Sequence, residues 1–338
     1  MHTISLFIPA LFWPHAQNGD DVPVVPCLRT LLGRSDEQHE VCDDDEAWLC
    51  ERFGVARQSD WPVAPIALLG TSTPPGESFW LRADPVHLQS NRDQLILLAS
   101  LSLGVTEAES TSLGVALNHH FVPEQIRFVT PEPQHWYLQA THVPRIHTTS
   151  LSRALGQTVD PLLPAGQDRL TWHRLFNEIQ MVLHDHPVNE ERLKRGALPI
   201  NSVWFSGGGI LPSALASFDQ VIGSSALVQG LCKLSNVPFR PVEQGLACVS
   251  GENALVELRE TDNASLALEP RAWKAALENL EQRWFAPLTQ LLRQGHIRRV
   301  YIATVTNGRS HQWSLSRNNL LWRWWKRIPP FPALATAG

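Results

Sequence analysis

The sequence predicts an α/β protein in which a doubly wound sheet is interrupted by an inserted α+β unit. Three features of the 338-residue chain indicate this class: an apolar first segment of strand length, alternating strand and helix patterns in the last third, and local strands with two amphipathic helices in the middle. Such alternation implies a parallel sheet with helices on its faces, because successive parallel strands need a crossover connection. Residues 1–80 and 207–338 are expected to form a discontinuous core, and residues 81–206 the inserted unit.

The first quarter of the chain is expected to begin with a strand. Residues 5–11 are apolar without a basic leader, and prolines interrupt them, which favours a buried strand over a signal peptide. Residues 25–32 have the spacing of a short helix. The acidic residues 43–46 match the first turn of another helix, where carboxylates meet the positive end of the dipole. Residues 62–76 carry prolines and glycines that predict turns.

The remaining elements follow from the period of the apolar residues. Helical spacing predicts helices at residues 107–121, 168–184, 225–234 and 270–294. Apolar or alternating runs predict strands at residues 95–101, 127–129, 136–139, 201–205, 220–222, 254–258 and 299–304. The longest helix has a broad core-facing stripe, formed by Trp273, Leu277, Leu280, Trp284, Leu288 and Leu291.

Composition excludes several classes of protein. With 43% hydrophobic and 18% charged residues, the chain is neither disordered nor fibrous. A net charge of -5 argues against a general affinity for nucleic acid or anionic lipid, since both need concentrated positive charge. No stretch reaches the roughly 18 apolar residues that span a bilayer. The five cysteines lack the spacing of a zinc site, which predicts reduced thiols and a cytoplasmic protein.

Polar and glycine residues concentrate between residues 184 and 209. We expect a helix to end near Pro187, a polar loop to present Asn189 and Arg192, and a strand to lead into Gly207, Gly208 and Gly209. A guanidinium suits phosphate or carboxylate, and glycines let backbone N–H groups approach an anion closely. The same residues would also cap a helix and fill a turn, so composition leaves both interpretations open.

This stretch resembles the archaeal-type cofactor-independent phosphoglycerate mutases. The family's motif is matched in order and spacing by His186, Pro187, Asn189, Arg192, Gly196, Pro199, Asn201, Gly207 and Gly209. Other segments are similar to the family at Ser59-Asp60, at residues 68–70, at residues 82–84 and at residues 225–231. The family belongs to the alkaline-phosphatase superfamily, so the resemblance implies an alkaline-phosphatase-like core sheet with an inserted α+β domain.

The resemblance also implies a metal-dependent reaction whose ligands this chain largely lacks. The family uses two divalent ions, held by Asp and His, to activate a serine that carries the phosphoryl group. Here the first strand has no carboxylate, Ser265 replaces a histidine ligand, and residues 304–308 lack the family's Asp and His. Ser206 replaces a substrate-binding arginine. Asp262 is the only surviving candidate ligand, so we expect no metal cofactor, and manganese or zinc only if activity remains.

Ser59 aligns with the family's nucleophile. A serine without a metal or a positioned base is a poor nucleophile at neutral pH, and a Ser-Asp pair is also an ordinary N-cap. Within the resemblance, the chain is also similar to the RpfE-type regulatory proteins of proteobacteria at residues 80–88, at residues 177–184 and in the glycine run.

Two further groups carry open alternatives. Arg82 and Asp84 stand at the start of the inserted domain, where an ion pair or a ligand contact explains them equally well. Residues 322–327 mix tryptophans with Arg323, Lys326 and Arg327. Such a segment stacks on bases or lies at a membrane surface, or it forms an edge strand whose tryptophans cover the core.

Three functional hypotheses follow. The preferred one is a catalytically silent relative of the mutases, a cytosolic regulatory protein that holds a phosphorylated or other anionic small molecule with Arg82, Asn189, Arg192 and the backbone of residues 207–209. The second is residual phosphoglycerate mutase or phosphoesterase activity with a rearranged metal site and Ser59 as nucleophile. The third is an adaptor that contacts nucleic acid or a membrane through residues 322–327. The sequence identifies no protein partner.

Overall fold

The computed structural model describes residues 2–13, 22–71, 73–91, 94–98, 103–242, 245–246, 249–266, 269–323, 325 and 328–331. The chain divides into two compact units, one formed by Met1–Phe53 with Leu215–Gly338 and the other by Gly54–Ala214. The second unit therefore begins at residue 54 and ends at residue 214, whereas the sequence places the inserted domain at residues 81–206. Residues 54–80 include a helix, α3 (Val63–Gly70), that packs on the strands of the second unit.

The first unit is built on a seven-stranded sheet of order β11-β10-β12-β1-β13-β14-β2. The first five strands in this order run parallel to one another, and β14 and β2 are antiparallel additions at one edge. The strands are β1 (His2–Phe7), β2 (Asp36–Val41), β10 (Gln220–Gly223), β11 (Phe239–Pro241), β12 (Asn253–Glu257), β13 (Ile297–Thr306) and β14 (Arg309–Ser316). The predicted α/β class is confirmed.

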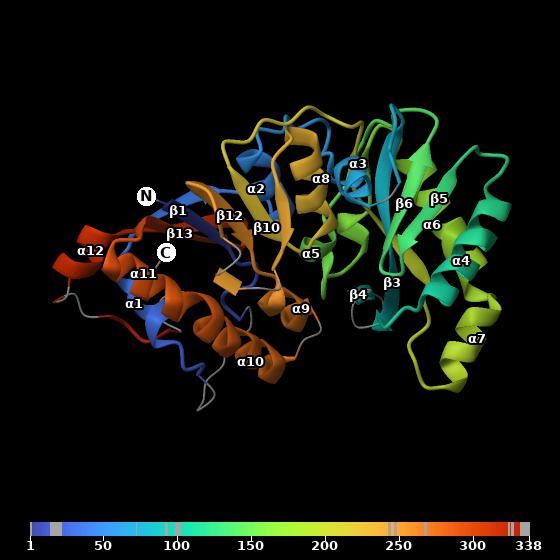
Figure 1. The fold of residues 1–338 in the computed structure, drawn as a ribbon. Coiled ribbons are helices and arrows are strands. Elements are labelled where there is room, and N and C mark those ends of the chain that lie inside the picture. The colour runs from blue at the N-terminus through green and yellow to red at the C-terminus, as the bar shows by residue number, and fades with distance from the viewer. Residues whose placement is uncertain are drawn as a thin grey trace. The chain divides into compact units, whose positions relative to one another are not determined.

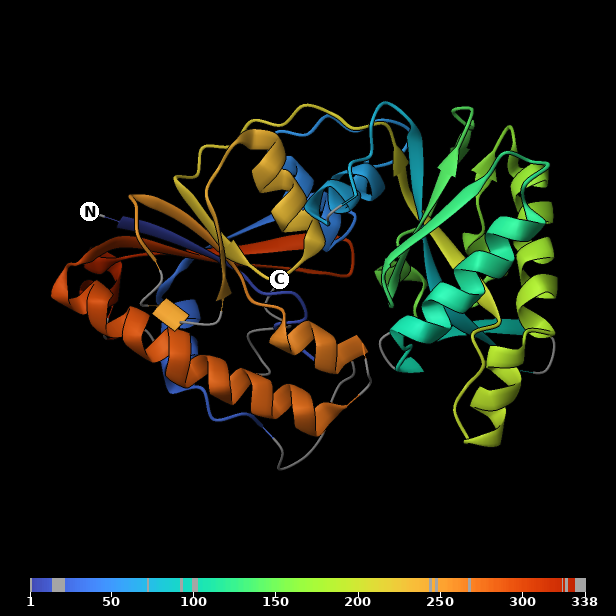
Figure 2. The same cartoon turned by 45° about the vertical axis from the view of Figure 1, so that its right-hand side comes forward.

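Helices cover both faces of this sheet, as the predicted doubly wound arrangement requires. In Figure 1 and Figure 2, α1, α10 and α11 lie on one face, and α2 and α8 lie on the other. The helices of this unit are α1 (Pro26–Arg34), α2 (Asp45–Arg52), α8 (Ala226–Ser235), α9 (Glu260–Leu266), α10 (Pro270–Leu280), α11 (Ala286–Gln294) and α12 (Arg317–Trp322). The helix predicted at residues 270–294 is interrupted by one π-helical turn, Glu281–Phe285, and its predicted stripe lies in the core.

The first strand is shifted from its predicted position at residues 5–11. β1 ends at Phe7, because Pro9 has no N–H to donate and Ala10 has a positive φ of 51°, which turns the chain. The acidic residues at 43–46 begin α2 as predicted, and the side chain of Asp44 accepts a hydrogen bond from the backbone N–H of Ala47.

The second unit is the inserted α+β unit, and the strands of its main sheet all pair antiparallel. Its strands are β3 (Phe79–Asn91), β4 (Gln94–Leu98), β5 (Arg127–Glu132), β6 (His135–Ala140), β7 (Ile146–His147), β8 (Ala165–Gly166) and β9 (Ser202–Gly209). Its other helices are α4 (Glu107–His120), α5 (Leu151–Ala154), α6 (Arg169–His184) and α7 (Pro187–Lys194). Within this unit α3 packs on one face of the sheet, and α4 and α6 pack on the other (Figure 2).

Two predicted irregular segments are helices. Residues 63–70 form α3, because Pro65 lies in the first helical turn, where a backbone N–H has no partner to lose. The polar loop expected around Asn189 is α7, which Pro187 starts at its first position and His186 caps through Nδ1, accepting from the N–H of Val188.

Two further findings concern the chain as a whole. Among the described residues, the longest and most apolar helices fall short of what a membrane crossing requires. Cys27, Cys42, Cys50 and Cys232 are free thiols, and Cys248 lies outside the described residues.

Candidate functional site

The carboxyl ends of β1 and β12 meet at one edge of the sheet in the first unit, where Asp262 lies. β1 and β12 are parallel neighbours, with Phe7 opposite Glu257. The loop after β1 is closed by helix side chains: Thr261 Oγ1 donates to the carbonyl of Pro9 at 2.8 Å, and Trp273 Nε1 donates to the carbonyl of Ala10 at 2.8 Å. The position at which the resemblance implies a metal-binding aspartate is therefore a tightly bound, uncharged turn.

At this edge the guanidinium of Arg259 lies among several carboxylates. It pairs with Asp262 and lies 3.4 Å from Glu257 Oε1. Burial disfavours the charge on Arg259, but Asp262, Glu257 and Asp45 more than offset it and raise the pKa of the guanidinium. Arg259 is therefore a fixed positive charge among three acidic side chains.

The three acids are held by different elements. Glu257 ends β12 and accepts hydrogen bonds from Ser225 Oγ at 2.7 Å and from the backbone N–H groups of Ser225 and Ser224, so it holds the N-cap residue of α8 in place. Asp45 lies in the first turn of α2. Burial raises the pKa of Asp45 well above its usual range, the charge of Asp262 raises it further, and Arg259 opposes both.

Arg259, Asp45 and Glu257 are the members of this cluster that the sequence did not single out; of these three, Arg259 and Asp45 are the pair farthest apart in the chain. Asp45 was predicted only as part of a helix start, and Arg259 carried no motif. The two residues lie more than 200 positions apart, so no local pattern signals their interaction.

This cluster does not fit the paired divalent ions that the resemblance implies. The carboxylate of Asp262 is paired with the guanidinium of Arg259, so it is already engaged where a metal ion would bind. Within the part of the chain that the structure describes, the one group that brings three potential ligand atoms within 4.8 Å of one another lies elsewhere, at Glu37, His39 and His311.

Ser59 and Asp60 lie in the second unit. Asp60 is buried and accepts from Thr148 Oγ1 at 2.6 Å and from the Thr148 N–H, and burial raises its pKa although these bonds oppose the shift. Ser59 is exposed, and its backbone carbonyl lies 3.1 Å from Nδ1 of His147. The alternative that Ser59 caps a helix is wrong, because α3 begins at Val63 after Pro62.

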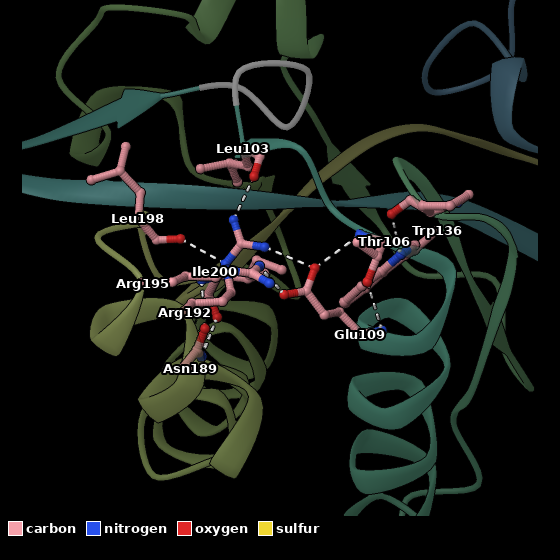
Figure 3. Close-up of polar contacts among 10 residues, drawn as sticks. Leu103, Thr106, Glu109, Trp136, Asn189, Arg192, Arg195, Leu198 and Ile200 are labelled. Atoms are coloured by element: carbon pink, nitrogen blue, oxygen red, sulfur yellow. Dashed lines mark hydrogen bonds and ion pairs between the residues drawn. The ribbon is translucent and has the colours of Figure 1, made fainter.

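Asn189 is buried and fully engaged by backbone groups. Its Nδ2 donates to the carbonyl of Leu183 at 2.7 Å. Nδ2 also donates to the carbonyl of Ile200 at 2.8 Å, and Oδ1 accepts from the N–H of Ile200 at 2.7 Å (Figure 3). These contacts tie the start of α7 to the end of α6 and to the segment that leads into β9.

Arg192 is also engaged within the protein. Its side chain is 0% exposed, with Nε donating to the carbonyl of Leu198, Nη2 to the carbonyl of Leu103, and Nη1 to Glu109 Oε2 at 2.9 Å (Figure 3). Glu109 pairs with Arg195 as well and completes a capping box with Thr106 at the start of α4. The described contacts thus give both residues a structural role: Arg192 joins α7 to α4, and Asn189 joins α7 to the end of α6 and to the segment before β9.

Arg82 neutralises a buried acid. Its Nη2 lies 2.8 Å from Oδ2 of Asp84, which is fully buried, and 2.6 Å from Nδ1 of His135. Burial opposes ionisation of Asp84, but Arg82 and His135 lower its pKa. Of the two interpretations of Arg82, an ion pair or a ligand contact, the ion pair is therefore the one that the geometry matches.

The three glycines lie inside β9 and serve close packing. A Cβ on Gly209 would lie 2.5 Å from Pro62 Cβ, one on Gly208 would lie 2.8 Å from Leu81 Cδ2, and one on Gly207 would lie 2.8 Å from Val63 Cβ. Gly207 also has a φ of +64°. Only glycine lets β9 approach α3 and its preceding turn this closely.

Of the carboxyl-terminal tryptophans that the structure describes, Trp322 and Trp325 do not lie in an edge strand, which was one alternative. α12 ends at Trp322, which is 72% exposed, and Trp325 is 65% exposed. Arg323 donates to the carbonyl of Arg34 and lies 2.7 Å from Asp36. Residues 324, 326 and 327 lie outside the described residues.

Comparison with known proteins gives a partial match. No family model matches the chain. A stretch of 73 residues is 37% identical to the "Probable 2,3-bisphosphoglycerate-independent phosphoglycerate mutase" of Geobacter sulfurreducens and 36% identical to the 2,3-bisphosphoglycerate-independent phosphoglycerate mutase of Methanosarcina mazei. In both comparisons it covers 22% of this chain and 18% of the relative. The matched stretch thus spans less than a fifth of the length of these curated relatives.

The likeness to solved structures extends over most of the chain. The PH0037 protein of Pyrococcus horikoshii matches with a TM-score of 0.52 and 12% identity, over 93% of this chain and 87% of that one. The cofactor-independent phosphoglycerate mutase of Thermoplasma acidophilum matches with a TM-score of 0.46 and 16% identity, over 94% of this chain and 90% of that one. A 73-residue stretch of the chain is thus homologous to part of the cofactor-independent phosphoglycerate mutases, and the α/β fold is similar to that of the PH0037 protein.

Proposed function

We propose that this protein is a phosphoglycerate-mutase-like protein that no longer catalyses phosphoryl transfer and acts in the cytoplasm as a regulatory or anionic-ligand-binding protein, of the RpfE type that its sequence resembles. The observation that carries the proposal is Arg259. A guanidinium among Asp262, Glu257 and Asp45 supplies the positive charge that bound cations would otherwise supply.

The end of β13 supports the same proposal. At residues 304–308, where the family has an Asp and a His, β13 continues to Thr306 and turns directly into β14. Asn307 and Gly308 both have positive φ, as expected for a tight hairpin turn. Residues 304–308 therefore offer no carboxylate or imidazole at the point where the family has metal ligands.

The proposed ligand is a phosphorylated or other anionic small molecule. Because the polar atoms of Asn189 and Arg192 bind the protein's own groups, we do not expect these two residues to touch the ligand. A thermal-shift screen of phosphorylated metabolites and nucleotides, with and without divalent ions, tests the proposal. A ligand at 100 times its Kd stabilises by about 2.7 kcal/mol. A screen in which no anion raises the unfolding midpoint would count against ligand binding.

Residual mutase or phosphoesterase activity is the second candidate. The 73-residue similarity to the mutases and the exposure of Ser59 favour it. Turnover of a phosphoglycerate in the presence of manganese or zinc should be compared among the wild type, Ser59→Ala, Asp262→Asn and the control Ser112→Ala, which alters an exposed serine of α4.

The two candidates give opposite results in this assay. A pseudoenzyme shows no turnover above background in any variant. Metal-dependent turnover that is lost in Ser59→Ala and Asp262→Asn, and kept in Ser112→Ala, would establish an enzyme.

The exposed Trp322 and Trp325 favour a third and weaker candidate, an adaptor for nucleic acid or a membrane. Its binding to single-stranded DNA or to anionic vesicles would fall steeply with salt, and would disappear when Arg323, Lys326 and Arg327 are neutralised together. Salt-independent binding, or none, excludes this candidate. The ion pair between Arg323 and Asp36 already reduces the free positive charge of the segment.

A further inference from the structure

Two histidines and a glutamate come together where β2 pairs with β14, at the edge of the sheet in the first unit. His39 and His311 are directly opposite in the antiparallel register, and Glu37 lies opposite Trp313, two residues along the same face. Glu37 Oε1 is 3.7 Å from Nε2 of His39 and 3.8 Å from Nδ1 of His311. One ligand atom from each of the three residues lies within 4.8 Å of the others.

Packing orients His311 within this group. Its ring stacks on that of Trp313 with centroids 5.8 Å apart and an interplanar angle of 18°, and Trp313 is buried in the core. The His39 ring meets the His311 ring edge-on, with centroids 4.6 Å apart. The side chain of His311 is 14% exposed, and those of Glu37 and His39 are 28% and 31% exposed. The group therefore packs against the core through His311 and is exposed to solvent on its other side.

We propose that Glu37, His39 and His311 bind one divalent transition-metal ion, with Zn²⁺ the best match. Two imidazole nitrogens and one carboxylate oxygen suit Zn²⁺ and its late first-row neighbours better than Mg²⁺ or Ca²⁺, which prefer oxygen ligands. At bond lengths of about 2.0–2.2 Å, ligand atoms of a tetrahedral site lie roughly 3.3–3.5 Å apart. The observed separations from Glu37 need to close by only a few tenths of an ångström.

The surroundings of His311 favour its neutral form. Burial lowers the pKa of His311, and the neighbouring His39 lowers it further, although Glu37 opposes the shift. Neutral imidazole is the form that binds metal. Three protein ligands leave a fourth position for water, and the ion would cross-link the edge strand β2 to β14.

Metal binding is measured on tag-free protein freed of metal by chelator and dialysis. Titration with Co²⁺, followed by the absorption bands of tetrahedral cobalt, and with Zn²⁺, followed by calorimetry, should give one site per chain. His39→Ala, His311→Ala and Glu37→Gln should each weaken binding at least about tenfold, since even outer-shell substitutions have effects of this size. The thiols of Cys42 and Cys232 will not compete, because burial raises the pKa of each to about 12.

Two controls keep the test specific. Glu40→Gln changes a carboxylate of the same strand on the opposite face and should leave the affinity unchanged. Asp262→Asn should also leave it unchanged, which separates this site from any metal bound for catalysis. Far-UV circular dichroism and the metal-free unfolding midpoint establish that each variant folds. If His311→Ala does not fold, His39→Ala and the near-isosteric Glu37→Gln carry the test.

The proposal is overturned if no saturable binding is seen. It is also overturned if the three substitutions leave the affinity unchanged or if Glu40→Gln weakens it equally. The expected result is one Zn²⁺ or Co²⁺ per chain, lost with each ligand and kept in both controls.

Discussion

Replacing Glu109 with Gln should destabilise the second unit by about 3 kcal/mol. Arg192 is fully buried, and Glu109 is its charged partner at 2.9 Å. Removing one member of a buried ion pair typically costs 3–5 kcal/mol, because the other charge stays buried without compensation. We expect the lower end of this range, since the guanidinium keeps the carbonyls of Leu103 and Leu198 and Gln retains an oxygen acceptor.

Helix α7, which carries Arg192, provides a matched control. Glu191 pairs with Lys194 on the surface of α7, where both side chains are about two-thirds exposed. Glu191→Gln removes the same charge from an exposed pair, so its effect should stay within about 0.5 kcal/mol. Urea unfolding followed by tryptophan fluorescence, together with hydrogen exchange of peptides from α4 and α7, measures both variants.

The pH dependence gives a second readout. The hydrogen bond from Thr106 and the charge of Arg192 lower the pKa of Glu109, although burial opposes the shift. A lowered folded-state pKa stabilises the protein above the unfolded-state value of about 4.3, and this stabilisation is lost as pH falls through the folded-state pKa. The difference between wild type and Glu109→Gln should therefore shrink below about pH 4. Equal stabilities of Glu109→Gln and Glu191→Gln at neutral pH would refute the reasoning.

Three other predictions follow from the structure. Gly209→Ala should destabilise the second unit by about 2 kcal/mol, because the added Cβ would lie 2.5 Å from Pro62, and urea unfolding measures this; an unchanged midpoint would mean that α3 does not pack on β9 as described. Ala10→Gly should stabilise the first unit by about 0.5–1 kcal/mol. Ala10 has a φ of 51°, and the strain of this conformation for alanine exceeds the extra backbone entropy that glycine loses on folding. A lower unfolding midpoint would contradict this prediction. At pH 8, Cys42 and Cys232 should react with iodoacetamide roughly a thousandfold more slowly in the native protein than after unfolding, because burial raises the pKa of each thiol to about 12. Peptide mass spectrometry after timed alkylation measures these rates. Similar rates in the two states would exclude the described burial.

The elements that the sequence predicts well are those whose signal is local. Residues 107–121 repeat apolar side chains at helical spacing, and α4 buries Leu113 and Leu117 as that spacing requires. The boundaries depend on single residues whose effect is harder to read. Pro187 signals both the end of one helix and the start of the next, and the structure uses it for the start of α7.

The candidate site was harder to predict, because a residue type does not reveal its partner. Arg192 reads as an anion-binding arginine until Glu109, 83 residues earlier, is seen beside it. The glycine run reads equally as a phosphate-binding loop, and only the positions of α3, the turn before it and β3 show why a Cβ would not fit. The motif carried information about the fold of this segment, and the spatial neighbours determine what each side chain does.

The pairing of Asp262 with Arg259 bears on how a surviving metal-ligand residue should be interpreted. Buried carboxylates without a counter-charge are costly, so a site that loses its cations must either lose its acids or acquire a positive group. In this protein the guanidinium of Arg259 supplies a positive charge beside Asp262, Glu257 and Asp45. Asp262 therefore has a structural reason to be present without any metal. A single acid retained from a two-metal site is therefore weak evidence for catalysis when a positively charged side chain pairs with it. It is stronger evidence where no such side chain is nearby.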